Sequence, residues 1–154
     1  SRRFVCVHSR IMKDAENTRS ICGKDSVLRC KENSLPGAKY RSVRWYKLVE
    51  EPSNKESGLL MKRLSPNSTT QWYAGLERKV ELLADHSFDI FLLNVTAVDS
   101  GRYKCLLAAP VGEQNQEGQV AFTISPQTNQ KAAESSPSSF HCGACGSIAK
   151  LCYF

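Results

Sequence analysis

The sequence contains no run of about 20 apolar residues, the length that a membrane-spanning helix needs, and few arrangements of side chains that could do chemistry. It has no glycine-rich phosphate-binding loop and no serine in a nucleophile-elbow motif. Asp85 and Asp89 are better explained as turn and strand-edge charges than as an acid–base pair. The three histidines fall in a leader, a turn and a tail: His8, His86 and His141. We therefore expect a protein that is not an enzyme and that needs no cofactor.

The charge balance argues against a nucleic-acid partner. Lys and Arg number 21 against 15 Asp and Glu, a formal net charge of +6. The basic residues are scattered, and no nucleic-acid-binding module is visible. Moderate basicity favours an acidic partner, whether protein, glycan or membrane surface, although a solvated surface is the simpler explanation of the charge.

Seven cysteines are many for a cytosolic chain of 154 residues, and they indicate an oxidising compartment. Because seven is odd, at least one is free or pairs between chains, which leaves a disulfide-linked dimer open. Two glycosylation sequons, at Asn67 and Asn94, point to the same compartment. We therefore expect an extracellular glycoprotein.

The cysteines near the end of the sequence are candidate zinc ligands, but their spacing gives little support for a zinc site. A structural zinc site needs four ligands in a compact frame, and His141 stands directly beside Cys142. A disulfide or a crosslink is the better interpretation of Cys142, Cys145 and Cys152, and we expect no metal.

Four residues predict the fold. Trp45 follows Cys30 by 15 positions (45 − 30), Cys105 follows Cys30 by 75 (105 − 30), and Tyr103 stands two places before Cys105. This is the spacing of an immunoglobulin sandwich, in which the two cysteines join facing sheets, the indole packs on the disulfide and the tyrosine hydroxyl anchors a corner. We predict an all-β, two-sheet immunoglobulin-like sandwich with Greek-key topology and a Cys30–Cys105 disulfide.

The segment between Trp45 and Asp99 decides the subtype. It is too long for a seven-stranded domain, and residues 59–64 and 69–73 are candidates for two extra edge strands. Nine strands are typical of the variable type of this sandwich.

Composition divides the chain into three parts. Residues 1–19 are polar and basic and are interpreted as a leader or an irregular segment. The domain itself is expected over residues 20–125. Residues 126–154 contain Gln, Asn, Ala, Ser and Pro and are interpreted as a flexible stalk or tail.

Alternating polar and apolar residues predict the other strands. Leu92, Trp45 and Tyr103 are expected in the core, and Asp99 is expected to pair with Arg78 or Lys79 at one end of the sandwich. The predicted strands are 26–30, 41–48, 79–82, 88–93, 102–107 and 118–124.

Alternation gives the strand at 88–93 no polar outer face, because Phe91 and Leu93 both point outward. Either a neighbouring strand or the first residues of the chain cover these side chains, or they form a contact patch. We favour cover.

The outward side chains of the strands around Trp45 and Cys105 predict a partner-binding face. An amphipathic aromatic residue, two aliphatic residues and three cations are placed there, and Tyr and Arg are enriched at interface centres. A merely solvated face is the alternative. The candidate residues, with the apolar tip of the following loop, are Arg44, Tyr46, Leu48, Arg102, Lys104, Leu106, Pro110 and Val111.

These elements resemble a variable-set receptor domain of the immunoglobulin superfamily over residues 20–125, about two-thirds of the chain. Within the superfamily, the sequence is similar to a dendritic-cell marker in a fish-like form. The resemblance implies a single-pass surface glycoprotein, also shed in soluble form, that modulates lymphocyte and antigen-presenting-cell responses. The residues that carry it are Cys22, Cys30, 43–48, 94–96, 99–105 and 105–120.

The sequence departs from this type of receptor at two places. No cysteine follows the last predicted strand, so the partner of Cys22 is left open between a later cysteine, Cys6 and none. The membrane helix is also missing, so the chain is either an ectodomain portion or a secreted form.

An adhesion or antigen-receptor-like domain that pairs with another immunoglobulin domain is the alternative. The Phe/Trp-Gly-x-Gly bulge of antigen receptors is absent, because Gln116 and Glu117 precede Gly118.

Overall fold

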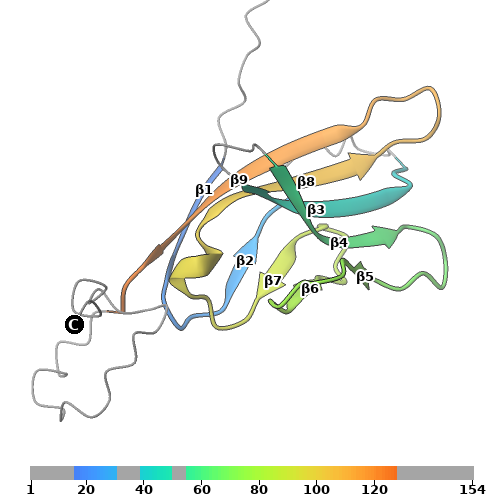
Figure 1. Ribbon diagram of the computed structural model, residues 1–154. Helices are drawn as coiled ribbons and strands as arrows, with labels where there is room; N and C mark the ends of the chain where they lie inside the picture. The colour runs from blue at the N-terminus through green and yellow to red at the C-terminus, as the bar shows by residue number, and fades with distance from the viewer. Residues whose placement is uncertain (1–15, 31–38, 50–54, 128–154) are drawn as a thin grey trace, which may run out of the picture.

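The computed structural model describes residues 16–30, 39–49 and 55–127. Their elements are β1 (Glu16–Ile21), β2 (Ser26–Leu28), β3 (Ser42–Val49), β4 (Lys55–Arg63), β5 (Gln71–Trp72), β6 (Val80–Leu82), β7 (Ile90–Leu92), the short 3-10 helix η1 (Ala97–Asp99), β8 (Gly101–Ala108) and β9 (Gln116–Ser125). One sheet has the order β1–β9–β8–β3–β4–β5 and the other the order β2–β7–β6 (Figure 1). The predicted two-sheet, all-β sandwich is confirmed, including both extra strands, β4 and β5.

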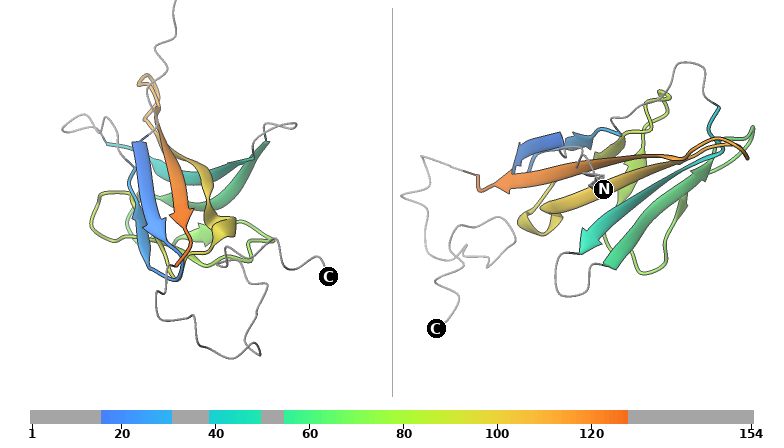
Figure 2. Two further views of the ribbon diagram at one scale, coloured as in Figure 1. Left: turned by 90° about the vertical axis from the view of Figure 1, so that its left-hand side faces the viewer. Right: turned by 90° about the horizontal axis from the view of Figure 1, so that it is seen from above.

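The core lies between the two sheets. Seen from above, β9, β8, β3 and β4 of the larger sheet run side by side (Figure 2). The inward side chains of both sheets are removed from water, as alternation predicts. The largest fully buried ones are Trp45, Phe122, Leu28, Leu60, Ile90, Leu92 and Leu107.

A disulfide joins the sheets at the centre of this core. Cys30 follows β2, Cys105 lies on β8, and their Cα atoms are 5.5 Å apart. Trp45 lies directly opposite Cys105 in the β3–β8 pairing and is fully buried. At the corner that leads into β8, the hydroxyl of Tyr103 donates a hydrogen bond to the carbonyl of Asp99 at 2.5 Å. The predicted disulfide between the sheets is thus present.

Strand structure begins four residues before the start of the domain expected at residue 20, inside the segment interpreted as a leader or an irregular segment. Strand β1 begins at Glu16 and pairs in parallel with β9, from Glu16 opposite Val120 to Ile21 opposite Ser125. No apolar alternation marks the start of β1, because its residues before Ile21 are all polar. Residues 1–15 lie outside the described part of the chain.

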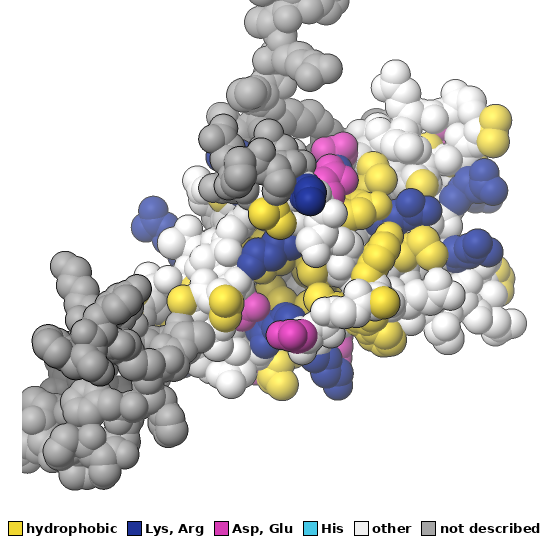
Figure 3. Space-filling view, viewed as in Figure 1, with side chains coloured by type: hydrophobic (Ala, Val, Ile, Leu, Met, Phe, Trp, Pro, Cys, Tyr) yellow, Lys and Arg dark blue, Asp and Glu magenta, His cyan; other side chains and the backbone are white. Residues whose placement is uncertain are grey.

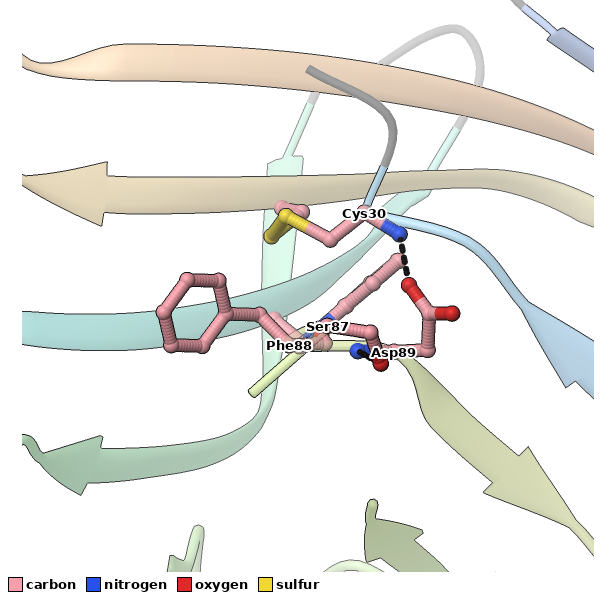
Figure 4. Close-up of a disulfide and its surroundings, with 6 residues drawn as sticks. Cys30, Ser87, Phe88 and Asp89 are labelled. Atoms are coloured by element: carbon pink, nitrogen blue, oxygen red, sulfur yellow. Dashed lines mark hydrogen bonds between the residues drawn. A yellow bond between two sulfur atoms is a disulfide. The ribbon is translucent and has the colours of Figure 1, made fainter. Parts of the chain in front are cut away.

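The strand predicted at 88–93 is also shorter than expected, because β7 begins only at Ile90. Phe88 has a φ of +62°, which is unusual for a bulky residue. Its carbonyl accepts the indole N–H of Trp45 at 2.8 Å instead of continuing the sheet. The backbone N–H of Cys30 donates to Asp89 Oδ1 at 2.8 Å (Figure 4). A side chain therefore replaces the missing backbone partner beside the disulfide.

Replacing Asp89 with alanine tests whether its carboxylate stands in for the missing backbone acceptor of the Cys30 N–H. The change leaves the half-buried N–H of Cys30 without its acceptor, so we expect Asp89→Ala to lower the free energy of unfolding by about 1–3 kcal/mol. Asp89→Asn retains an oxygen at the same place and should lose much less. Urea unfolding of the non-reduced proteins measures both changes, and equal losses for the two variants would contradict the assignment.

Candidate partner-binding face

The outward side chains of β3 and β8 lie together on the larger sheet, as predicted, and we call this surface the β3–β8 face. Strand register sets them in pairs, with Arg44 opposite Leu106, Tyr46 opposite Lys104 and Leu48 opposite Arg102. On the side of the molecule seen in Figure 3, Lys and Arg side chains lie among hydrophobic ones toward the right of the view. The β3–β8 face consists of Arg44, Tyr46, Leu48, Arg102, Lys104 and Leu106.

Lys104 is not the solvent-facing cation that the sequence predicts. Lys104 is only 8% exposed. Its ammonium group forms ion pairs with Glu56 of β4 and, at 3.9 Å, with Glu117 of β9. The same Nζ lies 5.1 Å from the ring centroid of Tyr46. Two carboxylates and one aromatic ring therefore neutralise or cover the charge of the Lys104 ammonium group, so little of that charge is available to a partner.

Tyr73 joins this face although the sequence did not point to it. Its ring lies 6.4 Å from that of Tyr46, and both approach Gly58 of β4, which is opposite Tyr46. A Cβ on Gly58 would stand 2.7 Å from the Tyr73 ring, so only glycine leaves room for this contact. Burial raises the pKa of the Tyr73 hydroxyl, Tyr46 raises it further, and Arg44 opposes the shift.

A register shift in β4 produces the gap at Gly58. Trp45 is opposite Leu60, while the next residue, Tyr46, is opposite Gly58, so Leu59 is an extra residue in β4. A bulge of this kind re-aims the side chains around it. It places glycine, rather than a larger side chain, opposite Tyr46 and against the ring of Tyr73.

Arg44 lies between apolar neighbours at one end of the face. It is opposite Met61 on β4 and Leu106 on β8. Its Nε atom is buried and has no hydrogen-bond partner among the described residues. Arg44 is thus a half-buried cation with donor capacity left over.

The loop between β8 and β9 carries the apolar tip that the sequence predicted. Val111 is 92% exposed, whereas Pro110 is half-buried. The loop is closed by two bonds, from Ala109 N–H to Asn115 Oδ1 at 2.8 Å and from Glu113 N–H to the Pro110 carbonyl at 3.1 Å. Val111 is therefore held out from the domain on a defined turn.

The charged residues at the opposite end of the sandwich are structural. Arg78 Nε lies 3.1 Å from Asp99 Oδ1, and Asp99 is buried. Lys47 donates to the carbonyl of Val98 at 2.6 Å, and burial lowers its pKa while Asp99 opposes that shift. Burial, followed by the charge of Asp99, raises the pKa of Tyr103 far above its ordinary value, so its hydroxyl stays neutral.

The two sequon asparagines lie outside the strands. Asn67 is exposed in the turn after β4, and Asn94 is exposed directly after β7. Each has a left-handed φ, +64° and +49°, which asparagine adopts more readily than most residues. Glycosylation of Asn67 and Asn94 stays a prediction.

The outward apolar residues of the smaller sheet are only partly covered. Phe91 is half-buried between Val27 on β2 and Glu81 on β6. Leu93, beyond the end of β7, is 54% exposed. Neighbouring strands therefore cover Phe91 in part and leave Leu93 open.

The described residues hold no group of three or more His, Cys, Asp or Glu side chains arranged for a metal ion. They also contain no helix long and apolar enough to cross a membrane. Cys22 is buried and disulfide-bonded, which rules out the alternative that it has no partner. Cys6, Cys142, Cys145 and Cys152 lie outside the described residues, and so do residues 128–154 of the stalk predicted at 126–154.

No protein-family model and no curated protein matches the sequence, but solved structures match the fold. An extracellular fragment of novel immune-type receptor 11 from Ictalurus punctatus, including its stalk region, is similar with a TM-score of 0.57 and 11% identity, covering 84% of this chain and 100% of that one. Tim-1 is similar with a TM-score of 0.56 and 15% identity over 77% of this chain and 98% of that one.

The extracellular domain of the voltage-gated sodium channel beta4 subunit gives a TM-score of 0.55 and 18% identity over 71% of this chain and 90% of that one. At these identities the likeness shows the fold alone. The chain has the variable-type immunoglobulin fold that extracellular domains of immune receptors and cell-adhesion proteins share.

Replacing Gly58 with alanine tests the packing under the tyrosine pair. The new Cβ would collide with the Tyr73 ring, so we expect Gly58→Ala to lower the free energy of unfolding by about 1–3 kcal/mol. In a Tyr73→Ala background the same change should cost much less, because the ring is gone. Thermal unfolding of the four proteins measures the coupling, and additive losses would show that the ring does not rest on Gly58.

Proposed function

We propose that the chain is a non-catalytic recognition protein of an immune-cell surface, or its soluble ectodomain, and that it binds a protein partner through the β3–β8 face. The observation that carries the proposal is the tyrosine pair Tyr46–Tyr73 beside Arg44 and Leu106. Tyrosine and arginine are the residues that most often dominate binding energy at interface centres. A binding role outside catalysis also agrees with the fold that the chain shares with receptors and adhesion proteins.

The arrangement of the domain supports this face over the rest of the surface. The apolar loop tip at Val111 follows β8 and extends the same side of the fold. Of the two predicted glycosylation sites, Asn94 follows β7 of the smaller sheet. The partner is therefore expected to contact β3, β8 and the loop that follows β8.

The finer identity proposed here rests on a resemblance in sequence. Cys22 eight places before Cys30, the run 45–48 and the run 105–120 are similar to cluster-of-differentiation eighty-three, a marker of mature dendritic cells, in a fish-like form. On that resemblance the protein modulates lymphocyte and antigen-presenting-cell responses at the cell surface. The stalk and the membrane anchor of such a protein would lie outside the described domain.

A second candidate is an adhesion domain that pairs with another immunoglobulin domain. Its support is the likeness to the beta4 subunit, for which parallel homodimers are described in connection with cell–cell adhesion. The same β3–β8 face would then meet a copy of itself or a related domain.

Paired substitutions on the two sheets test which surface binds. Tyr46→Ala with Leu106→Ser removes the apolar centre of the β3–β8 face, and we expect it to lower the binding of fluorescent tetramers of the chain to leukocytes by at least about tenfold. Val27→Ser with Leu93→Ser alters the outer face of the smaller sheet and should leave binding unchanged. Flow cytometry measures both, and the reverse pattern would move the binding surface to the smaller sheet.

Sedimentation velocity across protein concentrations separates the two candidate functions. A receptor for a different protein should remain monomeric through the micromolar range. A concentration-dependent dimer that Tyr46→Ala with Leu106→Ser dissolves would favour the adhesion alternative instead.

A further inference from the structure

The two cations at the centre of the β3–β8 face are in different electrostatic states. Lys104 is paired with Glu56 and Glu117, and its ammonium group lies over the Tyr46 ring. Arg44 has a buried Nε without a hydrogen-bond partner, and none of the ion pairs between described residues involves it. Positive charge is therefore available to a partner at Arg44 and largely neutralised at Lys104.

Leaving a buried donor of a charged side chain without a hydrogen bond costs free energy. A guanidinium satisfies such donors best with a planar anion, because its N–H groups form a fork that matches the two oxygens of a carboxylate. Two apolar side chains flank Arg44, because Met61 on β4 and Leu106 on β8 are directly opposite it. Low solvent access strengthens an ion pair formed there.

The number of free cations limits which anion fits. A phosphate or sulfate group with two or more charges is best held by several cations or backbone amides. At the centre of the face the second cation, Lys104, is already occupied by its own carboxylates. The guanidinium of Arg44, with its buried and unpartnered Nε between Met61 and Leu106, matches a single carboxylate carried by a chain that also supplies apolar contacts.

We propose that Arg44 is the anchor for an aspartate or glutamate side chain of the protein partner, which enters between Met61 and Leu106 beside the Tyr46–Tyr73 pair. This inference rests on the proposed function, because it names the chemistry of the partner at the same face. The net charge of +6 on the whole chain favours the approach of an acidic partner, and the buried pair then sets how long the complex lasts.

Charge-matched variants test the anchor in the full chain. Arg44→Gln should lower leukocyte binding by about tenfold or more, mainly by raising the dissociation rate, and Arg44→Lys should recover only part of it because ammonium lacks the planar fork. Lys79→Gln removes the same charge just before β6 of the smaller sheet, where Lys79 is exposed and, among the described residues, is ion-paired only with Glu81 at 3.4 Å. That control should leave the dissociation rate unchanged, and circular dichroism and thermal unfolding check that each variant is folded.

Enzymatic treatment of the cells identifies the source of the carboxylate. Trypsin should abolish binding of the chain, whereas sialidase should leave it intact. Loss of binding after sialidase alone, or binding that survives trypsin, would overturn the assignment to a protein side chain and indicate a sialylated glycan or another non-protein ligand.

The same panel separates failure of this inference from failure of the proposed function. If Tyr46→Ala with Leu106→Ser loses binding while Arg44→Gln retains it, the face binds but the carboxylate anchor is wrong. If both variants bind as well as the unaltered chain, or if the unaltered chain binds no leukocyte, the proposed function fails and the anchor fails with it.

Discussion

The disulfide between Cys30 and Cys105, packed against Trp45, is the constraint on which the rest of the structure depends. Closing a loop of 75 residues stabilises the fold by about 4 kcal/mol in the chain-entropy model. Its larger consequence is register. Because Trp45 lies opposite Cys105, the neighbouring pairs on β3 and β8 must point outward, and a slip of one residue would exchange the two faces. The contact that holds the sheets together thus also selects Arg44, Tyr46 and Leu106 as surface residues.

The same contact deforms the smaller sheet. The indole N–H of Trp45 needs an acceptor inside the core, and the carbonyl of Phe88 supplies it at 2.8 Å. Phe88 adopts a left-handed backbone conformation to do so. The side chain of Asp89 then accepts the hydrogen bond from the backbone N–H of Cys30. Satisfying one buried donor therefore moves the start of β7 from the predicted residue 88 to Ile90. The indole N–H of Trp45 and the backbone N–H of Cys30 beside the disulfide both have acceptors.

Local sequence patterns were enough for the two layers, the disulfide and the extra strands, because each depends on alternation or on fixed spacing within the chain. They were not enough where distant strands decide the outcome. Lys104 points outward as alternation predicts, but it is buried because β4 and β9 bring Glu56 and Glu117 to it. Tyr73 joins the face only because a bulge in β4 sets Gly58 beneath it. Strand β1 begins before the residue at which the domain was expected to start, because its first five residues are polar and show no apolar alternation.

The charges on the β3–β8 face have separate roles as a result. The pairing of Lys104 with two carboxylates and the Tyr46 ring ties β3, β4, β8 and β9 together across the sheet. Such a network stiffens the surface that a partner meets, and a rigid surface loses less conformational entropy on binding. Arg44, which no described carboxylate neutralises, is then the place where the face can discriminate. A basic net charge attracts many acidic molecules, whereas one half-buried guanidinium between Met61 and Leu106 favours those that present a carboxylate beside apolar groups.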